Sequence, residues 1–332
     1  MALKWGIASA GKISYDFAVA LSTLPEDEHS IVAVAARDQK RAEDFAKNFD
    51  IPKSYNSYEQ LANDPEIQIV YIGAIHPHHY DIGIMMLENN KHILCEKPLC
   101  MNEKQAKKLI TYAERKKLFL MEAVWSRFFP AYQYIRKQIN TGLLGDIEQV
   151  DVQFGFDLTT ADRVQKKELG GGCILDIGIY TIQISQWAFQ QPPKSIEAKG
   201  ELNSEGVDIE VNAKIHYSDK TFSNIKFSGK EALTNTAVIK GSKASITLKN
   251  FWCPTTIIDI DGKEKTWVLP ESKYKTNYIN SVGLRYEAEE ARKCILEGKI
   301  QSDHMNHNES LLLAHIEDEF RKQVGVTYKE DE

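Results

Sequence analysis

The sequence predicts an α/β protein with two domains. Residues 1–124 are expected to form a doubly wound parallel sheet, and residues 125–332 an α+β domain with a large, mainly antiparallel open sheet. The chain has 332 residues, which is more than one hydrophobic core usually serves. Short apolar runs alternate with amphipathic stretches in the first part, an order typical of parallel βαβ units. From Trp125 onward the stretches are longer and alternate apolar with polar residues, which favours antiparallel strands.

The first domain is predicted to alternate buried strands with amphipathic helices. Apolar runs of strand length are bounded by amphipathic segments whose apolar residues recur at helical spacing. The strands are expected at 4–10, 31–36, 69–74, 92–95 and 119–122, and the helices at 12–23, 39–49, 78–89 and 103–117.

The second domain is predicted to open with a helix, continue as a sheet and close with two helices. The short connections 218–220 and 241–243 are compatible with hairpins. The strands are expected at 147–156, 209–217, 221–228, 236–240 and 244–248, and the helices at 130–140, 286–297 and 308–323.

Composition limits the classes of partner. The net charge of -6 provides no basic surface for nucleic acid. The apolar run 3–10 is too short to span a bilayer, so no membrane partner is expected. The five cysteines are scattered and odd in number, which indicates neither a disulfide framework nor a metal site. We therefore expect a cytoplasmic protein with a small-molecule substrate and no bound metal.

A glycine-containing turn follows the first predicted strand. Gly6, Ala8 and Gly11 occupy the spacing of a dinucleotide fingerprint, with Ala8 in place of its second glycine. The backbone N–H groups of Lys12 and Ile13 would face the phosphates at the helix start. The alternative is an ordinary tight turn.

The end of the second strand indicates the cofactor. Arg37 stands where NAD enzymes carry an acid for the ribose 2'-hydroxyl, and Arg41 follows one helical turn later. Two guanidinium groups here would pair with the 2'-phosphate of NADP. Both arginines could instead lie on a solvated helix start, and Asp38 could serve as the ribose acid.

Two further segments carry candidate chemical groups. Glu96 and Lys97 follow the apolar run 92–95, at the carboxyl end of a predicted strand. Asp176 and Tyr180 lie four residues apart after a triple glycine, a spacing that places them on one face of a helix.

These motifs together resemble the glucose-fructose oxidoreductase and inositol dehydrogenase family. The resemblance rests on the Ala-variant glycine loop, the Glu-Lys-Pro tripeptide and the Gly-Gly-Gly-x-x-x-Asp-x-Gly-x-Tyr run, and it covers essentially the whole chain. It implies a Rossmann domain, a mostly antiparallel partner domain, a homodimer and an NADP-dependent hydride transfer. Within the family, the chain resembles a branch that oxidises trans-dihydrodiols or aldopyranoses.

The resemblance implies that Lys97 and Tyr180 are the catalytic pair. A tyrosine hydroxyl titrates near ~10 in water, and an adjacent ammonium would stabilise its phenolate, making Tyr180 a better proton acceptor. Asp176 would orient the substrate hydroxyl or Lys97, or alternatively cap the following helix. Without the family context, Lys97 reads as a surface lysine and Tyr180 as a core aromatic residue.

The resemblance also implies contacts around these groups. His76, His79 and Glu96 are expected on the cofactor side, together with Lys97. The two histidines could instead be caps or packing residues, or metal ligands, although further ligands at metal spacing are missing from the sequence. Aromatic residues are expected around the substrate, with core filling or dimer contact as the alternative: Trp125, Phe154, Trp252 and Tyr278.

Three functions compete at this point. The first is the NADP-dependent oxidation named above, and the second keeps the fold but changes the substrate to another cyclic polyol, dicarbonyl or steroid ketone. The third is a cofactor-sensing protein without turnover, which would be expected to lose Lys97 or Tyr180.

Overall fold

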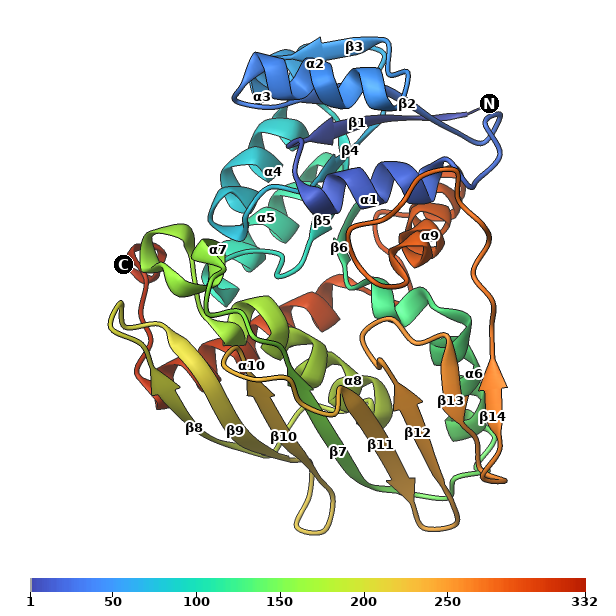
Figure 1. Ribbon diagram of the computed structural model, residues 1–332, viewed down its shortest axis with the longest axis vertical. Coiled ribbons are helices and arrows are strands. Elements are labelled where there is room, and N and C mark those ends of the chain that lie inside the picture. The colour runs from blue at the N-terminus through green and yellow to red at the C-terminus, as the bar shows by residue number, and fades with distance from the viewer. Residues whose placement is uncertain (1) are drawn as a thin grey trace. The chain divides into compact units, whose positions relative to one another are not determined.

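A computed structural model describes residues 2–332 as two compact units, each shown in Figure 1. The first unit comprises the chain up to Cys100 together with Lys104–Trp125 and Leu269–Ser310. The second comprises Met101–Glu103, Ser126–Val268 and Leu311–Glu332.

The first unit is built on a six-stranded parallel sheet in the order β3-β2-β1-β4-β5-β6. This confirms the predicted doubly wound sheet. Its strands are β1 (Leu3–Ala8), β2 (His29–Ala35), β3 (Lys53–Tyr55), β4 (Ile69–Ile72), β5 (His92–Glu96) and β6 (Leu120–Ala123). Its helices are α1 (Lys12–Leu21), α2 (Gln39–Asn48), α3 (Tyr58–Asn63), η1 (His76–His78), α4 (His79–Glu88), η5 (Ser281–Gly283) and α9 (Leu284–Leu296), and most of α5 (Glu103–Lys116) belongs here too.

The apolar runs of these strands follow from burial on both faces. All four residues of β4 are buried, and the ring of Tyr71 stacks on Phe17 of α1 with centroids 3.8 Å apart. A parallel strand covered by helices on both sides reads as a continuous apolar run rather than an alternating one. The sequence analysis missed β3, since its three residues are only partly buried and are too few to show a period.

A late segment of the chain belongs to the first unit, which differs from the expected division into residues 1–124 and 125–332. The fully buried Asp16 of α1 accepts hydrogen bonds from the amides of Asn277 and Tyr278, at 2.8 and 2.9 Å, and from the Ser281 hydroxyl at 2.6 Å. Helix α9 then packs against α1, as Figure 1 shows. A buried carboxylate requires such donors, and the chain supplies them from a region remote in sequence.

The second unit contains an eight-stranded sheet in the order β14-β13-β12-β11-β7-β10-β9-β8. Only β7 and β10 pair in parallel, so the predicted, mainly antiparallel sheet is confirmed. Both predicted hairpins join neighbouring antiparallel strands. The strands are β7 (Ile147–Gly155), β8 (Ser195–Leu202), β9 (Asp208–His216), β10 (Phe222–Ser228), β11 (Thr236–Gly241), β12 (Ser245–Lys249), β13 (Thr256–Ile258) and β14 (Glu264–Thr266).

Helices cover one face of this sheet. Helix α8 (Ile179–Phe189) packs on β7 and β10, and Phe320 of α10 (His307–Val324) stacks on Phe227 of β10. Ten of the eleven α8 residues are buried, and four of these ten are polar: Thr181, Gln183, Ser185 and Gln186. None of the helices in residues 2–332 is both long and apolar enough to cross a membrane. The remaining helical segments are η2 (Trp125–Phe128), α6 (Pro130–Asn140), α7 (Asp162–Gln165), η3 (Lys167–Leu169), η4 (Ile174–Gly178) and η6 (Lys329–Asp331).

Candidate active site

The glycine turn lies where the strand order of the parallel sheet reverses, between β1 and β4. Gly11 is the N-cap of α1 and provides no side-chain cap, so the amides of Lys12 and Ile13 stand in the first turn without a side-chain acceptor from the N-cap. A Cβ added to Gly6 would come within 2.9 Å of the Ile67 side chain, which explains a glycine there. Ala8 is fully buried in β1. A helix N-terminus at the switch point of such a sheet fits the phosphates of a dinucleotide.

The end of β2 holds the residues expected at the adenosine side. Asp38 caps α2, because its side chain accepts the amide of Arg41 at 3.1 Å. The Arg41 guanidinium reaches back to the Ala10 carbonyl of the glycine turn at 3.2 Å. Arg37 is exposed. Asp38 thus serves as a helix cap, and the guanidinium groups of Arg37 and Arg41 stand close to it in the sequence.

Tyr58 is a neighbour of these arginines that the sequence analysis missed. Burial raises the pKa of its hydroxyl, while the charges of Arg37 and Arg41 and a hydrogen bond with Ser9 act in the opposite direction. Tyr58 begins α3, which follows the missed strand β3. The strand β3 would have revealed Tyr58, because β3 pairs with β2 and Tyr58 follows it, near the end of β2 where the arginines lie.

Lys97 follows β5 in a turn that buried side chains hold in place. The Tyr71 hydroxyl donates to Glu96 at 2.6 Å, and the Lys97 amide donates to the other Glu96 oxygen at 3.2 Å. Glu122 of the neighbouring β6 accepts the Leu99 amide at 2.8 Å. Burial raises the pKa of Glu96, and the Tyr71 hydrogen bond and the Lys97 charge counter it. These contacts fix the backbone from which the lysine side chain extends.

The two histidines expected beside the cofactor differ in their surroundings. His79 is buried, with Nδ1 lying 2.9 Å from the Pro98 carbonyl and Nε2 lying 2.9 Å from the Ala74 carbonyl. Its ring therefore lies between the turn after Lys97 and the end of β4. Burial lowers the pKa of His79, and the single N–H of the neutral ring donates to one of these two carbonyls. This geometry does not favour a side-chain contact from His79 to nicotinamide. His76 is partly exposed at the start of η1.

Asp176 and Tyr180 lie on one continuous helical segment of the second unit. Asp176 lies within η4, which is a π-helical turn, and Tyr180 is the second residue of α8. Single π turns inside helices occur frequently at functional sites. Asp176 is an interior residue of the segment and forms an ion pair with Arg163 of α7. The alternative of a helix cap is therefore not supported, and the sequence analysis missed Arg163 because α7 has only four residues.

Tyr180 belongs to a group of aromatic rings in the second unit, which we call the aromatic group: Phe154, Phe156, Tyr180 and Trp252. Phe154 contacts Trp252 and Tyr180 with ring centroids 4.7 and 5.7 Å apart, and Phe156 contacts Trp252 at 5.5 Å. Tyr180 retains 7% of its surface and Trp252 retains 8%. The structure thus brings together two of the four expected aromatic residues with the expected catalytic tyrosine.

The other two expected aromatic residues belong to the first unit. Trp125 is buried at the start of η2, and it is the last residue of the first unit before the chain enters the second. Tyr278 is 40% exposed, and its amide donates to Asp16 of α1. The backbone of Tyr278 therefore lies beside α1, the helix that follows the glycine turn.

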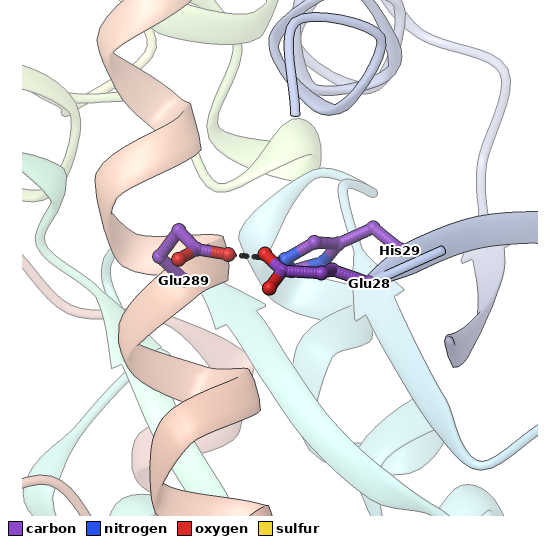
Figure 2. Close-up of side chains that lie close together, drawn as sticks. All are labelled: Glu28, His29 and Glu289. Carbon is purple, nitrogen blue, oxygen red and sulfur yellow. Dashed lines mark hydrogen bonds and ion pairs between the residues drawn. The ribbon is translucent and has the colours of Figure 1, made fainter. Parts of the chain in front are cut away.

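A cluster of Glu28, His29 and Glu289 has the spacing of a metal site within residues 2–332. The Trp5 indole N–H donates to Nδ1 of His29 at 3.1 Å, so Nε2 carries the proton and donates to Glu289 at 2.5 Å. Figure 2 shows this contact between β2 and α9. A metal on Nε2 would move the proton to Nδ1, opposite another donor. The cluster is better explained as a link that holds α9.

Comparisons with known proteins agree with this arrangement. Residues 3–124 match the family model "Oxidoreductase family, NAD-binding Rossmann fold", and residues 132–247 match "GFO/IDH/MocA C-terminal domain". Trans-1,2-dihydrobenzene-1,2-diol dehydrogenase of Danio rerio is 45% identical over 100% of this chain and 99% of its own length.

Two solved structures share the fold at low sequence identity. Levoglucosan dehydrogenase in complex with NADH and levoglucosan has a TM-score of 0.84 and 19% identity, covering 98% of both chains. KijD10, a 3-ketoreductase from Actinomadura kijaniata in complex with NADP and TDP-benzene, has a TM-score of 0.82 and 22% identity, covering 99% of both chains. With both family models matched and a relative similar along its whole length, the chain belongs to the GFO/IDH/MocA family of oxidoreductases.

Proposed function

We propose that this oxidoreductase transfers a hydride between NADP and the hydroxyl-bearing carbon of a trans-dihydrodiol or an aldopyranose, with Tyr180 as general acid and base and Lys97 assisting. The observation that carries the proposal is the position of Tyr180, whose ring lies in the aromatic group on the same helical segment as the Asp176 carboxylate. Aromatic walls suit both a dihydrodiol ring and the apolar face of a sugar. The name of the relative from Danio rerio favours the dihydrodiol.

The chemistry assigns one task to each group. The oxidised nicotinamide of bound NADP would supply the hydride acceptor. Tyr180 accepts the hydroxyl proton in oxidation and returns it in reduction. The Lys97 ammonium favours the phenolate form of Tyr180 and the developing alkoxide, and Asp176 orients the substrate hydroxyl. Glu96 and His76 complete the proposed cofactor side. The aromatic residues proposed to contact the substrate are Trp125, Phe154, Trp252 and Tyr278.

The cofactor choice is attributed to Arg37 and Arg41. Wild type is expected to oxidise at least one member of a panel of trans-dihydrodiols, pentoses and hexoses with a higher kcat/KM for NADP than for NAD. Arg37→Ala should lower the NADP-to-NAD ratio of kcat/KM by about 100-fold, because a bidentate charged contact with the 2'-phosphate is lost. Steady-state kinetics with both cofactors measure this ratio.

Lys40→Ala is the matched control for this prediction. Lys40 lies on the same first turn of α2 and pairs with Asp44 on the surface, so its removal takes one positive charge from the helix start. The ratio should be nearly unchanged in this variant. A preference for NADP that survives in Arg37→Ala would show that the arginine is a bystander.

We also propose a cytoplasmic homodimer that associates through the open face of the eight-stranded sheet. Val150 and Val152 of β7 point into the core, whereas Asp151 points to the opposite face. There its carboxylate accepts hydrogen bonds from Asn224 at 2.7 Å and Lys240 at 2.6 Å. This face is turned away from the core side of the sheet, and we propose that a second copy covers it. The five cysteines of residues 2–332 are buried thiols, which fits a reducing compartment.

Sedimentation equilibrium at micromolar concentration is expected to give the mass of two chains. Lys240→Glu should weaken association by about tenfold or more, because it reverses one charge on the proposed interface of each copy. Lys322→Glu is the control, since that side chain is 77% exposed on α10. A monomer in wild type, or equal association of both variants, would contradict this interface.

A further inference from the structure

The helical segment that carries Asp176 and Tyr180 begins without a cap of its own. Cys173, its N-cap residue, makes no side-chain hydrogen bond to the first turn. The acceptor comes instead from Asp208, the first residue of β9, whose carboxylate accepts the Ile174 amide at 2.7 Å. Asp208 is fully buried, and burial raises its pKa to about 6, opposed by hydrogen bonds from nearby backbone amides. A carboxylate at this position accepts a hydrogen bond from an amide that the helix itself leaves unpaired. Its negative charge also stabilises the positive end of the helix dipole.

The glycine loop before this segment is enclosed tightly. Gly172 has a φ of +126°, and a Cβ there would lie 2.5 Å from Asp208 Oδ1 and 2.9 Å from the Tyr328 hydroxyl oxygen. A Cβ on Gly171 would lie 2.6 Å from the Val164 carbonyl oxygen. Only glycine fits these places. The Tyr328 hydroxyl also donates to the Gly171 carbonyl.

Tyr328 belongs to a C-terminal tail that is fastened to the second unit. Asp331 accepts hydrogen bonds from Arg321 at 2.7 Å, from the Tyr328 amide at 2.9 Å and from Asn102 at 2.9 Å. Arg321 is itself 4% exposed. Tyr328 then packs in a buried apolar cluster with Leu175, the residue directly before Asp176.

We infer that Asp208 and Tyr328 form an anchor that sets the position of the segment 174–180, and that both are positioning residues for the proposed reaction. Asp208 accepts the first amide of the segment, that of Ile174, and the Tyr328 hydroxyl donates to the Gly171 carbonyl in the loop that leads into it. Asp176 lies two residues after Ile174, whose amide Asp208 accepts, and Tyr180 follows one helical turn later. This inference rests on the proposed role of Tyr180.

The anchor acts on catalysis through geometry. Neither Asp208 nor Tyr328 belongs to the proposed catalytic groups, so their loss removes no proton donor or acceptor from the reaction. A displacement of about 1 Å in a reacting group is enough to lower a rate by roughly 100-fold. A loosened segment is therefore expected to lower kcat more than it raises KM.

Three variants test the anchor. Tyr328→Phe removes the hydroxyl that meets Gly171 and keeps the ring in its cluster. Asp208→Ala removes the acceptor for the Ile174 amide, whereas Asp208→Asn keeps an oxygen at that position. Lys329→Ala is the control, because that side chain is 83% exposed on the same tail.

Two measurements are made on each full-length variant. In hydrogen–deuterium exchange without substrate, peptides covering 171–180 should exchange about tenfold faster in Tyr328→Phe and Asp208→Ala than in wild type. In steady-state kinetics, kcat should fall by about tenfold or more in the same two variants. Asp208→Asn should stay close to wild type in both the exchange rate and kcat. Lys329→Ala should equal wild type in both.

The two measurements separate the anchor from the proposed function. Unchanged exchange in both Tyr328→Phe and Asp208→Ala would overturn the anchor whatever the activity, and Tyr328→Phe decides the matter should Asp208→Ala fail to fold. Faster exchange with an unchanged kcat would overturn the link to catalysis. If wild type oxidises none of the panel, the proposed function fails, and the exchange measurement still decides whether the anchor exists.

Discussion

Tyr180→Phe is expected to lower kcat by about 100-fold or more while the affinity for NADPH stays nearly constant. The substitution keeps the ring in the aromatic group and removes only the hydroxyl that exchanges a proton with the substrate. In wild type, the oxidation rate should rise with pH, because the deprotonated hydroxyl is the form that accepts the proton. Steady-state rates across pH, together with NADPH titration by fluorescence, measure both effects.

Tyr217→Phe is the matched control for this variant. Tyr217 is also buried in the second unit, where its ring stacks on Phe189 at 4.0 Å, outside the aromatic group. Its loss of a hydroxyl should leave kcat within about twofold of wild type. If Tyr180→Phe retains the wild-type rate and pH profile, the proton travels by another route. Asp176 is then the next candidate.

Lys97→Met is expected to lower kcat by at least as much as Tyr180→Phe. It removes the positive charge that stabilises the phenolate and the developing alkoxide, while a side chain of similar length remains. The turn itself should persist, because the backbone amides of Lys97 and Leu99 still donate to Glu96 and Glu122 in this variant. The pH-dependent rise of the oxidation rate should move to higher pH or disappear.

Lys107→Met provides the comparison for Lys97→Met. Lys107 lies ten residues after Lys97 and is exposed on α5, so this variant also loses one positive charge, but from the protein surface. It should resemble wild type in rate and in pH profile. Tight NADPH binding by wild type without turnover of any polyol, dihydrodiol or carbonyl would instead favour a cofactor-sensing protein.

The sequence was sufficient for the framework because periodicity and turn chemistry are local properties. The six-residue strand β1 and the glycine turn after it can be predicted from one short stretch of sequence. The same holds for the four-residue spacing of Asp176 and Tyr180. Helix α6 has the bounds expected from its apolar period and its leading proline. These signals need no knowledge of distant segments.

The sequence was insufficient where distant segments meet. Asp16 reads as a solvated helix residue, yet it is buried and receives donors from Asn277 and Ser281. Arg163 and Tyr58 lie in elements of four and six residues, too short for a period to reveal them. The family resemblance implies a cofactor contact for His79, whose ring is buried between the backbone carbonyls of Ala74 and Pro98. Each of these roles depends on tertiary pairing, which no single stretch of residues encodes.

The return of Leu269–Ser310 to the first unit limits how this enzyme can be divided. A fragment ending at residue 124 would leave Asp16 buried without Asn277, Tyr278 and Ser281, and it would uncover the face of α1 that α9 packs against. Such a fragment is not expected to fold as an independent cofactor-binding module. Most of the sheet-bearing unit is instead an insertion between two parts of the first. A chimaera with another oxidoreductase would therefore have to exchange 126–268 together with 311–332, which belong to the same unit, and keep 269–310 with the parent of the first unit.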